Sequence, residues 1–314
     1  MSVRVGTSGW SYPTGRGKWN GVFYPVGSGR SKKKGTFDEL RFYAEHFDTV
    51  EVNSTFYRVP TAETTKGWAE RTPANFEFSL KVFQKFTHPE MFAKATGADP
   101  SALNDTDVNE FRRAIDPLAE AGKLGALLAQ FPASFKNEGN NRGYLEWLLA
   151  AFKDYQLAVE LRHRSFSDDP EGTLGLLGEF GAALAQIDEP KFRLSIRQTL
   201  LPNVRTFYYM RLHGRNAEQW WRHEKSEDRY NYLYTADELQ PIVDAAESAS
   251  RQVKKAYLYT NNHFSAKSVA NAATIKHKLG QPLDGEYPEE FVERFPDLKG
   301  LVRILPPRPS DTLV

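Results

Sequence analysis

Eight short apolar segments of strand length, separated by longer amphipathic segments, constrain the fold of this chain more than any other feature. The segments are residues 3–10, 49–54, 76–82, 125–131, 157–163, 181–188, 206–214 and 255–263. Most are rich in β-branched or aromatic residues, whereas the fourth and sixth are rich in alanine, so periodicity alone does not exclude a helix there. Strands that alternate with helices predict parallel βαβ units with right-handed crossovers.

The intervening segments carry apolar residues at helical spacing. They are residues 37–47, 61–72, 107–122, 144–155, 173–181, 236–252 and 265–280. Thr36 and Thr61 are the expected N-caps of the first two helices. Residues 189–205, between the sixth and seventh strands, contain no convincing helix.

This order predicts an α/β protein with a single (β/α)8 TIM-like barrel, in which the helix between strands 6 and 7 is weak or missing. We expect the barrel to span residues 1–305 and residues 306–314 to form a flexible tail. A doubly wound open sheet is the alternative, but no GxGxxG turn follows the first strand.

Composition restricts the classes of function. The 314 residues include 41 basic and 40 acidic side chains, so the net charge of +1 implies neither a nucleic acid nor a membrane as partner. The absence of cysteine excludes disulfides, thiol nucleophiles and cysteine-ligated zinc. The first strand begins at Val3, which leaves no room for a signal peptide, and no apolar run approaches the roughly 20 residues of a membrane span. We therefore expect a cytoplasmic protein.

Polar residues recur near the C-terminal end of nearly every predicted strand. They include Ser8, Trp10, Glu51, Asn53, Lys81, Gln130, Glu160, Arg162, Asp188, Arg211, His213, Asn261, Asn262 and His263. Side chains alternate between the faces of a strand, so the pairs Glu51 and Asn53, Glu160 and Arg162, and Arg211 and His213 each share a face. Charged groups are costly to bury, and the C-terminal ends of the strands form the functional face of such barrels. The pattern predicts a site.

A structural network is the main alternative. In that case Glu51 and Glu160 pair with Arg162, Arg211 and Lys81 inside the barrel, and the charges balance without any chemistry.

Motifs along nearly the whole chain carry a family resemblance. They are GTSGW (6–10), FYP (23–25), TVEVNSTFYRVP (49–60), FTH (86–88), LLAQFP (127–132), AVELRHRSF (158–166), YMRLHGR (209–215) and YTNNH (259–263). With them the sequence resembles the YecE-like family, the domain of unknown function 72. The resemblance implies a TIM-like barrel and a site at its mouth. It implies no reaction, because the activity of that family is not established.

We weigh three functions for this site. The first is a hydrolase or lyase that acts on an anionic, for example phosphorylated, small molecule. Glu51 and Glu160 are then the acid/base pair, and His213 is a further base. Lys81, Arg162 and Arg211 hold the anion. The remaining substrate-binding candidates are Trp10, Asn53, Tyr57, Gln130, Asp188, Asn261 and Asn262.

The second is a metal-dependent phosphoesterase or isomerase. Its ligands come from Glu51, Glu160, Asp188, His213 and His263. We predict no cofactor, with a divalent metal as the alternative, because the chain has no HExxH motif and the arginines compete for the carboxylates.

The third function is nucleic-acid binding or processing, which we favour least. Its support is the basic loop at residues 27–35 and the aromatic pair Trp220 and Trp221. We expect the loop to be solvated rather than a lid over the substrate. We expect the tryptophans to pack a long loop over the barrel mouth. The sequence does not predict an oligomeric state.

Overall fold

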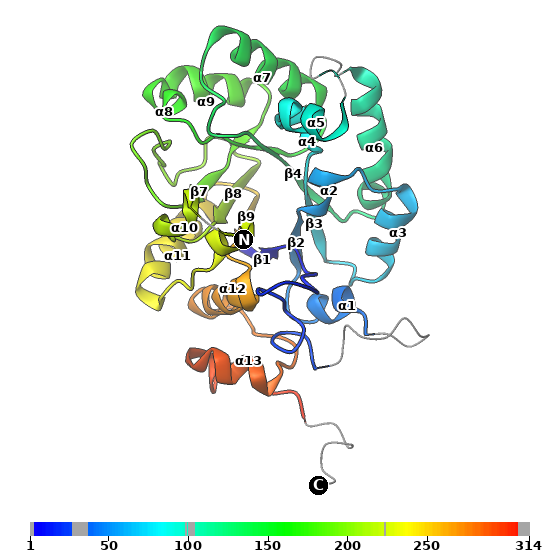
Figure 1. Ribbon diagram of the computed structural model, residues 1–314, viewed down its shortest axis with the longest axis vertical. Coiled ribbons are helices and arrows are strands. Elements are labelled where there is room, and N and C mark those ends of the chain that lie inside the picture. The colour runs from blue at the N-terminus through cyan, green and yellow to red at the C-terminus, as the bar shows by residue number, and fades with distance from the viewer. Residues whose placement is uncertain (1–2, 27–36, 98, 100–103, 223, 307–314) are drawn as a thin grey trace.

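Parallel strands pair around a ring that helices enclose (Figure 1). The computed structural model describes residues 3–26, 37–97, 99, 104–222 and 224–306. The strands are β1 (Val3–Ser8), β2 (Thr49–Val52), β3 (Glu77–Lys81), β4 (Leu124–Gln130), β5 (Leu157–Glu160), β6 (Ala183–Leu184), β7 (Gln186–Asp188), β8 (Phe207–Leu212) and β9 (Lys255–Thr260). Their order in the sheet is β6-β5-β4-β3-β2-β1-β9-β8-β7.

The ring closes through one interrupted segment. β6 pairs with β5, β7 pairs with β8, and only Ala185 separates β6 from β7. The N–H of Ala185 donates to the carbonyl of Val159 at 2.9 Å. β6 and β7 thus correspond to the sixth predicted strand, and the TIM-like barrel is confirmed.

Helices connect the strands on the outside of the ring. The longer ones are α3 (Ala62–Glu70), α5 (Pro89–Thr96), α6 (Asp105–Glu120), α7 (Gly139–Ala151), α9 (Pro170–Glu179), α11 (Ala236–Ser250) and α12 (Lys267–Lys278). The shorter ones are α1 (Glu39–Ala44), α2 (Ser54–Tyr57), α4 (Gln84–Thr87), α8 (Ser165–Asp168), α10 (Ala217–Trp221) and α13 (Glu289–Arg294). Within the part of the chain that the structure describes, 3₁₀ helices lie at Ser226–Tyr230, Phe264–Ala266 and Pro296–Leu298.

The helix predictions hold with local corrections. Thr61 caps α3 by accepting from the N–H of Thr64, as predicted. Asp38 caps α1, because its carboxylate accepts from the N–H groups of Leu40 and Arg41. Thr36, the predicted cap, lies outside the described residues. No helix lies in residues 189–206, which confirms the missing helix before β8.

Alanines and tyrosines fill the inside of the barrel. Ala126 of β4, Ala158 of β5, and Ala183 and Ala185 beside it contribute small side chains, and Leu128 of β4 packs with them. Tyr209 of β8 and Tyr257 and Tyr259 of β9 contribute large ones. Small residues on one side of the barrel leave room for the rings from the other side. This packing explains why the alanine-rich segments are strands and not helices.

The hydroxyl groups of these tyrosines donate hydrogen bonds to polar side chains of β2 and β3 inside the barrel. Tyr257 donates to Glu77 at 2.5 Å, and Tyr259 donates to Ser79 at 2.9 Å. Tyr209 donates to Glu51 at 2.7 Å. The buried hydroxyls are thereby satisfied, and the last one reaches the predicted site.

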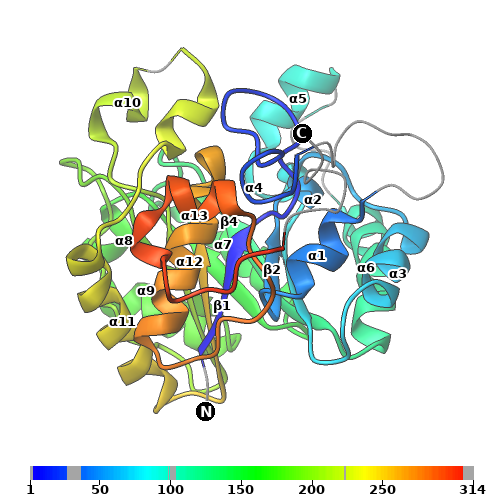
Figure 2. The same cartoon turned by 90° about the horizontal axis from the view of Figure 1, so that it is seen from below.

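The loops that follow the strands gather at one end of the barrel. Figure 2 shows α2, α4, α5 and α10 at the end opposite the N-terminus. Among the described residues, no helix is both long enough and apolar enough to cross a membrane. The predicted basic loop at residues 27–35 and nearly all of the predicted tail lie outside the described residues.

Candidate functional site

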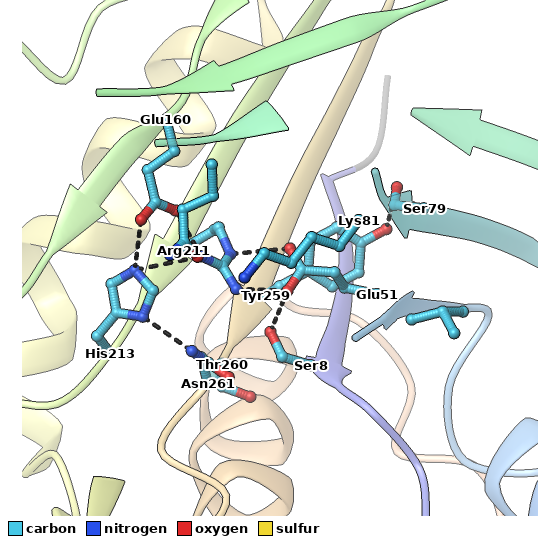
Figure 3. Close-up of polar contacts among 12 residues, drawn as sticks. Ser8, Glu51, Ser79, Lys81, Glu160, Arg211, His213, Tyr259, Thr260 and Asn261 are labelled. Atoms are coloured by element: carbon cyan, nitrogen blue, oxygen red, sulfur yellow. Dashed lines mark hydrogen bonds and ion pairs between the residues drawn. The ribbon is translucent and has the colours of Figure 1, made fainter. Parts of the chain in front are cut away.

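Glu51 lies fully buried at the end of β2, with hydrogen-bond donors at both carboxylate oxygens (Figure 3). Arg211 donates through Nη2 to Oε1 at 2.7 Å and through Nε to Oε2 at 2.8 Å. Ser8 donates to Oε1 at 2.6 Å, and Tyr209 donates to Oε2 at 2.7 Å. A carboxylate offers about four lone-pair positions. The four donors therefore fill the acceptor capacity of Glu51.

Glu160, at the end of β5, is held by two arginines. Nη1 of Arg211 lies 2.5 Å from its Oε2, and Nη2 of Arg162 lies 2.6 Å from its Oε1. Burial would raise the pKa of Glu160, but the guanidinium groups of Arg211 and Arg162 outweigh it and hold that pKa well below its usual range. Glu160 is therefore a carboxylate ion at neutral pH. Gln130 accepts from Nη1 of Arg211 at 3.0 Å and adds an uncharged member to the cluster.

His213 is buried beside Glu160. Its Nε2 lies 3.4 Å from Oε1 of Glu160, and the amide nitrogen of Asn261 donates to its Nδ1 at 2.9 Å. Burial lowers the pKa of His213 to about 4. The charge of Glu160 acts to raise that pKa, and the charge of Arg211 acts to lower it. The ring is neutral at pH 7, and its Nδ1 lone pair is already used. Trp220, which is buried, packs edge-on against it at 6.4 Å between ring centroids.

Arg162 joins the network to Glu189, which the sequence analysis did not select. Nη1 of Arg162 lies 3.3 Å from Oε2 of Glu189. Glu189 is buried, and burial raises the pKa of its carboxyl despite the opposing charge of Arg162. Glu189 directly follows β7. It is an even number of residues from Ala183 and Ala185, which face the barrel interior, so its side chain points to the same face. That two-residue period indicates Glu189 only once the structure shows that Ala183 and Ala185 face inward.

Lys81, the last residue of β3, differs from the other charged groups of the site. Within the described residues its ammonium nitrogen makes no hydrogen bond or ion pair. It lies 3.9 Å from the centre of the Phe56 ring. Burial and the positive charges of Arg211 and Arg162 lower the pKa of Lys81 to about 7, against the opposing effect of Glu160.

The remaining candidates have other contacts. Asp188 accepts from Arg215 at 2.8 Å and from Tyr234 at 2.8 Å, and Asn262 donates to Asn271 of α12 at 2.7 Å. Successive side chains of a strand point to opposite faces, so Asp188 and Asn262 point away from the face that Glu189 and Asn261 share with the network. They therefore bind groups outside the network.

The aromatic candidates are likewise outside the network. Trp10 packs against Trp68 and Phe78, with ring centroids 5.5 and 6.4 Å apart, and the Tyr57 side chain is exposed. Asn53 occupies the N-cap position of α2 without a side-chain capping hydrogen bond, and its side chain lies beside the Tyr12 hydroxyl. Phe56, and not Tyr57, is the ring that contacts Lys81.

Comparison with known proteins identifies the family. The family described as "Protein of unknown function DUF72" matches residues 4–291. The chain belongs to the DUF72 family. A DUF72 family protein from Thermotoga maritima is 32% identical, and its crystal structure covers 90% of this chain and 100% of its own, with a TM-score of 0.73. A DUF72 family protein from Enterococcus faecalis shares the fold with a TM-score of 0.75, over 92% of this chain and 100% of its own, at 24% identity.

Two UPF0759 proteins are also similar to this chain. UPF0759 protein YunF of Bacillus subtilis is 26% identical over 292 residues, which are 91% of this chain and 96% of that protein. UPF0759 protein YecE of Escherichia coli is 31% identical over 129 residues, which are 40% of this chain and 42% of YecE. These names give no reaction for this DUF72 protein.

A cavity of this DUF72 protein lies at the segments that follow β3 and β4. Its volume is about 800 Å³, and its lining comes mainly from α4, α5, α7 and the loop after β4. The aromatic lining residues are His88, Phe131, Phe135, Tyr144 and Trp147. His88 packs edge-on against Phe56 at 5.1 Å, and Phe56 in turn contacts Lys81.

The described residues of this DUF72 protein contain no group of three or more His, Asp or Glu side chains arranged to hold a metal ion. The carboxylates that the sequence offered as ligands are instead bound to Arg211, Arg162 and Arg215.

Proposed function

We propose that this protein is an enzyme of the hydrolase or lyase type that acts on a small anionic molecule at the C-terminal end of the barrel. The observation that carries the proposal is the Lys81 ammonium group, for which the described residues supply no counter-ion. A charge that is partly withdrawn from water and has no partner is costly, and such groups are concentrated at functional sites. An anionic substrate would supply the missing partner.

The surrounding charges support an anion over a cation. Arg211 and Arg162 lie close enough to Lys81 to depress its pKa, and their positive charges repel a cation. The carboxylates nearest to Lys81 are already paired with these arginines. A phosphate or carboxylate placed at Lys81 gains an ion pair without displacing another one.

The rest of the substrate has a candidate place in the aromatic cavity. Phe56 and His88 connect the cavity to Lys81, and burial together with Lys81 and Arg162 lowers the pKa of His88 to about 4. The neutral His88 ring and its aromatic neighbours suit an apolar or ring-containing group. The proposed substrate thus has an anionic end at Lys81 and a less polar body in the cavity.

The acid–base roles of Glu51, Glu160 and His213 stay predictions. The four donors around Glu51 favour a positioning role over proton exchange, because no acceptor site is left for a substrate proton. Glu160 and His213 are also engaged, in both cases by neighbours from the same network.

Calorimetry with inorganic phosphate tests the proposal. An anion beside Lys81 favours its charged form, so binding near pH 7 takes up a proton at Lys81. We expect the apparent binding enthalpy to depend on the ionisation enthalpy of the buffer, with an uptake of about half a proton at a pH equal to the pKa of about 7.

Lys85 is the matched control for this measurement. It lies on α4, four residues after Lys81 in the sequence, but is paired with Asp107 at 2.8 Å. Lys85→Met is expected to keep the phosphate binding and the proton uptake, whereas Lys81→Met is expected to abolish both. Binding that persists unchanged in Lys81→Met contradicts the proposal.

A further inference from the structure

The Lys81 amine is set apart from other lysines of the chain by its surroundings. Lys85 is ion-paired with Asp107, and the buried Lys123 donates to the carbonyls of Ala69 and Thr72 at 2.6 and 2.7 Å. Lys81 has neither kind of contact within the described residues. Its side chain ends against the face of Phe56 and is partly buried.

The charged groups around Lys81 come from several strands. Arg211 lies on β8, Arg162 and Glu160 come from the end of β5, and Glu51 is on β2. Burial and the two arginines outweigh the two carboxylates, and the pKa of Lys81 falls to about 7, while His88 on the neighbouring loop is neutral. About half of the Lys81 side chains are therefore uncharged at neutral pH, whereas an ordinary lysine is almost fully protonated there.

A neutral lysine amine at the mouth of a barrel is a nucleophile. Amines become reactive when burial or a neighbouring cation lowers their pKa, and they then attack carbonyl groups. The unpaired position of Lys81 leaves its lone pair free of competing contacts. The rigid Glu51–Arg211–Glu160 network below it holds its surroundings in place.

We infer that Lys81 is a covalent catalytic residue that forms a Schiff base with an aldehyde or ketone carrying a carboxylate or phosphate group. This inference rests on the proposed function and narrows it to the lyase type. The substrate class is a small anionic carbonyl compound.

The covalent step forms a C–N bond and releases water. The amine lone pair attacks the carbonyl carbon, and one N–H proton passes to the carbonyl oxygen, which gives a carbinolamine. The C–O bond then breaks, the oxygen leaves as water with one proton taken from solvent, and a protonated C=N group remains on Nζ. The net change is amine plus carbonyl plus one proton to iminium plus water. The iminium withdraws electrons, so a bond next to the former carbonyl carbon becomes easier to break.

Reductive trapping of the whole chain tests the inference. Glyoxylate is the anionic probe, glycolaldehyde is the neutral probe, and sodium cyanoborohydride reduces any Schiff base to a stable amine. Peptide mapping by mass spectrometry locates the adduct. We expect one carboxymethyl group, on Lys81, at glyoxylate concentrations that leave Lys85 and exposed lysines at least tenfold less modified.

The pH dependence of reductive trapping at Lys81 is a second test of the inference. Trapping at Lys81 is expected to rise up to about pH 7 and then to level off, because the amine is already neutral above its pKa. An ordinary surface lysine gains about tenfold in reactivity per pH unit up to roughly pH 10. Lys81→Met is expected to remove the adduct, and Lys85→Met is expected to leave it unchanged.

The trapping experiment tests the Schiff base, whereas phosphate binding tests the proposed function, so the two can fail independently. An unmodified Lys81, or a Lys81 that reacts no faster than exposed lysines, overturns the Schiff base even if phosphate binds with proton uptake. Rapid trapping by glyoxylate supports it. Equal trapping by glycolaldehyde supports Lys81 as a nucleophile. It shows no preference for an anion, however, and contradicts an anionic carbonyl compound as the substrate.

Discussion

Arg211 binds both oxygens of Glu51, through Nη2 at 2.7 Å and Nε at 2.8 Å, and with its remaining nitrogen it also binds Glu160 at 2.5 Å. One guanidinium thus joins strands β2, β5 and β8 across the inside of the barrel. Both carboxylates are fully buried, so each depends on this cation.

Removal of the Arg211 cation is therefore expected to destabilise the fold. Arg211→Met leaves Glu51 and Glu160 buried without their shared partner and should lower the free energy of unfolding by about 3–5 kcal/mol. Urea unfolding followed by circular dichroism measures the change. The control is Arg197→Met, at an exposed arginine, which should change the free energy by less than about 0.5 kcal/mol. An Arg211→Met variant as stable as the parent chain would show that the network does not support the fold.

Lys81→Met is expected to have the opposite effect. The folded-state pKa of about 7 lies below the ordinary value, so folding pushes the lysine towards its neutral form and costs stability at neutral pH. Replacement by an apolar side chain should raise the free energy of unfolding at pH 7 by about 1–2 kcal/mol. Thermal melting measures the gain. Lys85→Met, which loses an ion pair with Asp107, should lower stability by about 0.5–1 kcal/mol. A lower melting temperature for Lys81→Met would place Lys81 among the residues that stabilise the fold.

Stability is expected to fall as the pH drops from about 6.5 to 4. Burial lowers the pKa values of His46, His213 and His263 to about 4 in the folded chain, whereas the unfolded chain has the ordinary value of about 6.5. Between these values the unfolded chain binds more protons, so acid favours unfolding, by up to about 1.4 kcal/mol per pH unit for each histidine.

Urea midpoints measured from pH 4.5 to 7.5 check this slope. His277 is exposed, and His277→Gln should leave the slope unchanged. A midpoint that is constant over this range would contradict the depressed pKa values.

Elemental analysis checks the metal-dependent alternative. Because Arg211 and Arg162 occupy Glu51 and Glu160, we expect less than about 0.1 zinc or manganese per purified chain, and no change in melting temperature after treatment with a chelator. One tightly bound metal per chain would contradict this expectation and revive the phosphoesterase or isomerase hypothesis.

The two-residue alternation of the strands was enough to predict several members of the site. It predicted that Glu160 and Arg162 share a face, and that Arg211 and His213 do, and these four side chains meet in the structure. It was not enough for Asp188 and Asn262, because the sequence does not tell which of two adjacent polar residues at a strand end faces inward. Glu189 was missed for the same reason.

The order of strands and helices determined the barrel, because parallel strands linked by helices have few ways to bury their apolar faces. The recurrence of charged residues at the strand ends likewise determined that one mouth is polar. Only the tertiary structure decided which charges neutralise one another. Closure of the ring brings Arg211 to Glu51, which precedes it by 160 residues, and leaves Lys81 unpaired within the described residues. Pairing depends on distances of a few ångströms across the barrel, which no local pattern along the chain encodes.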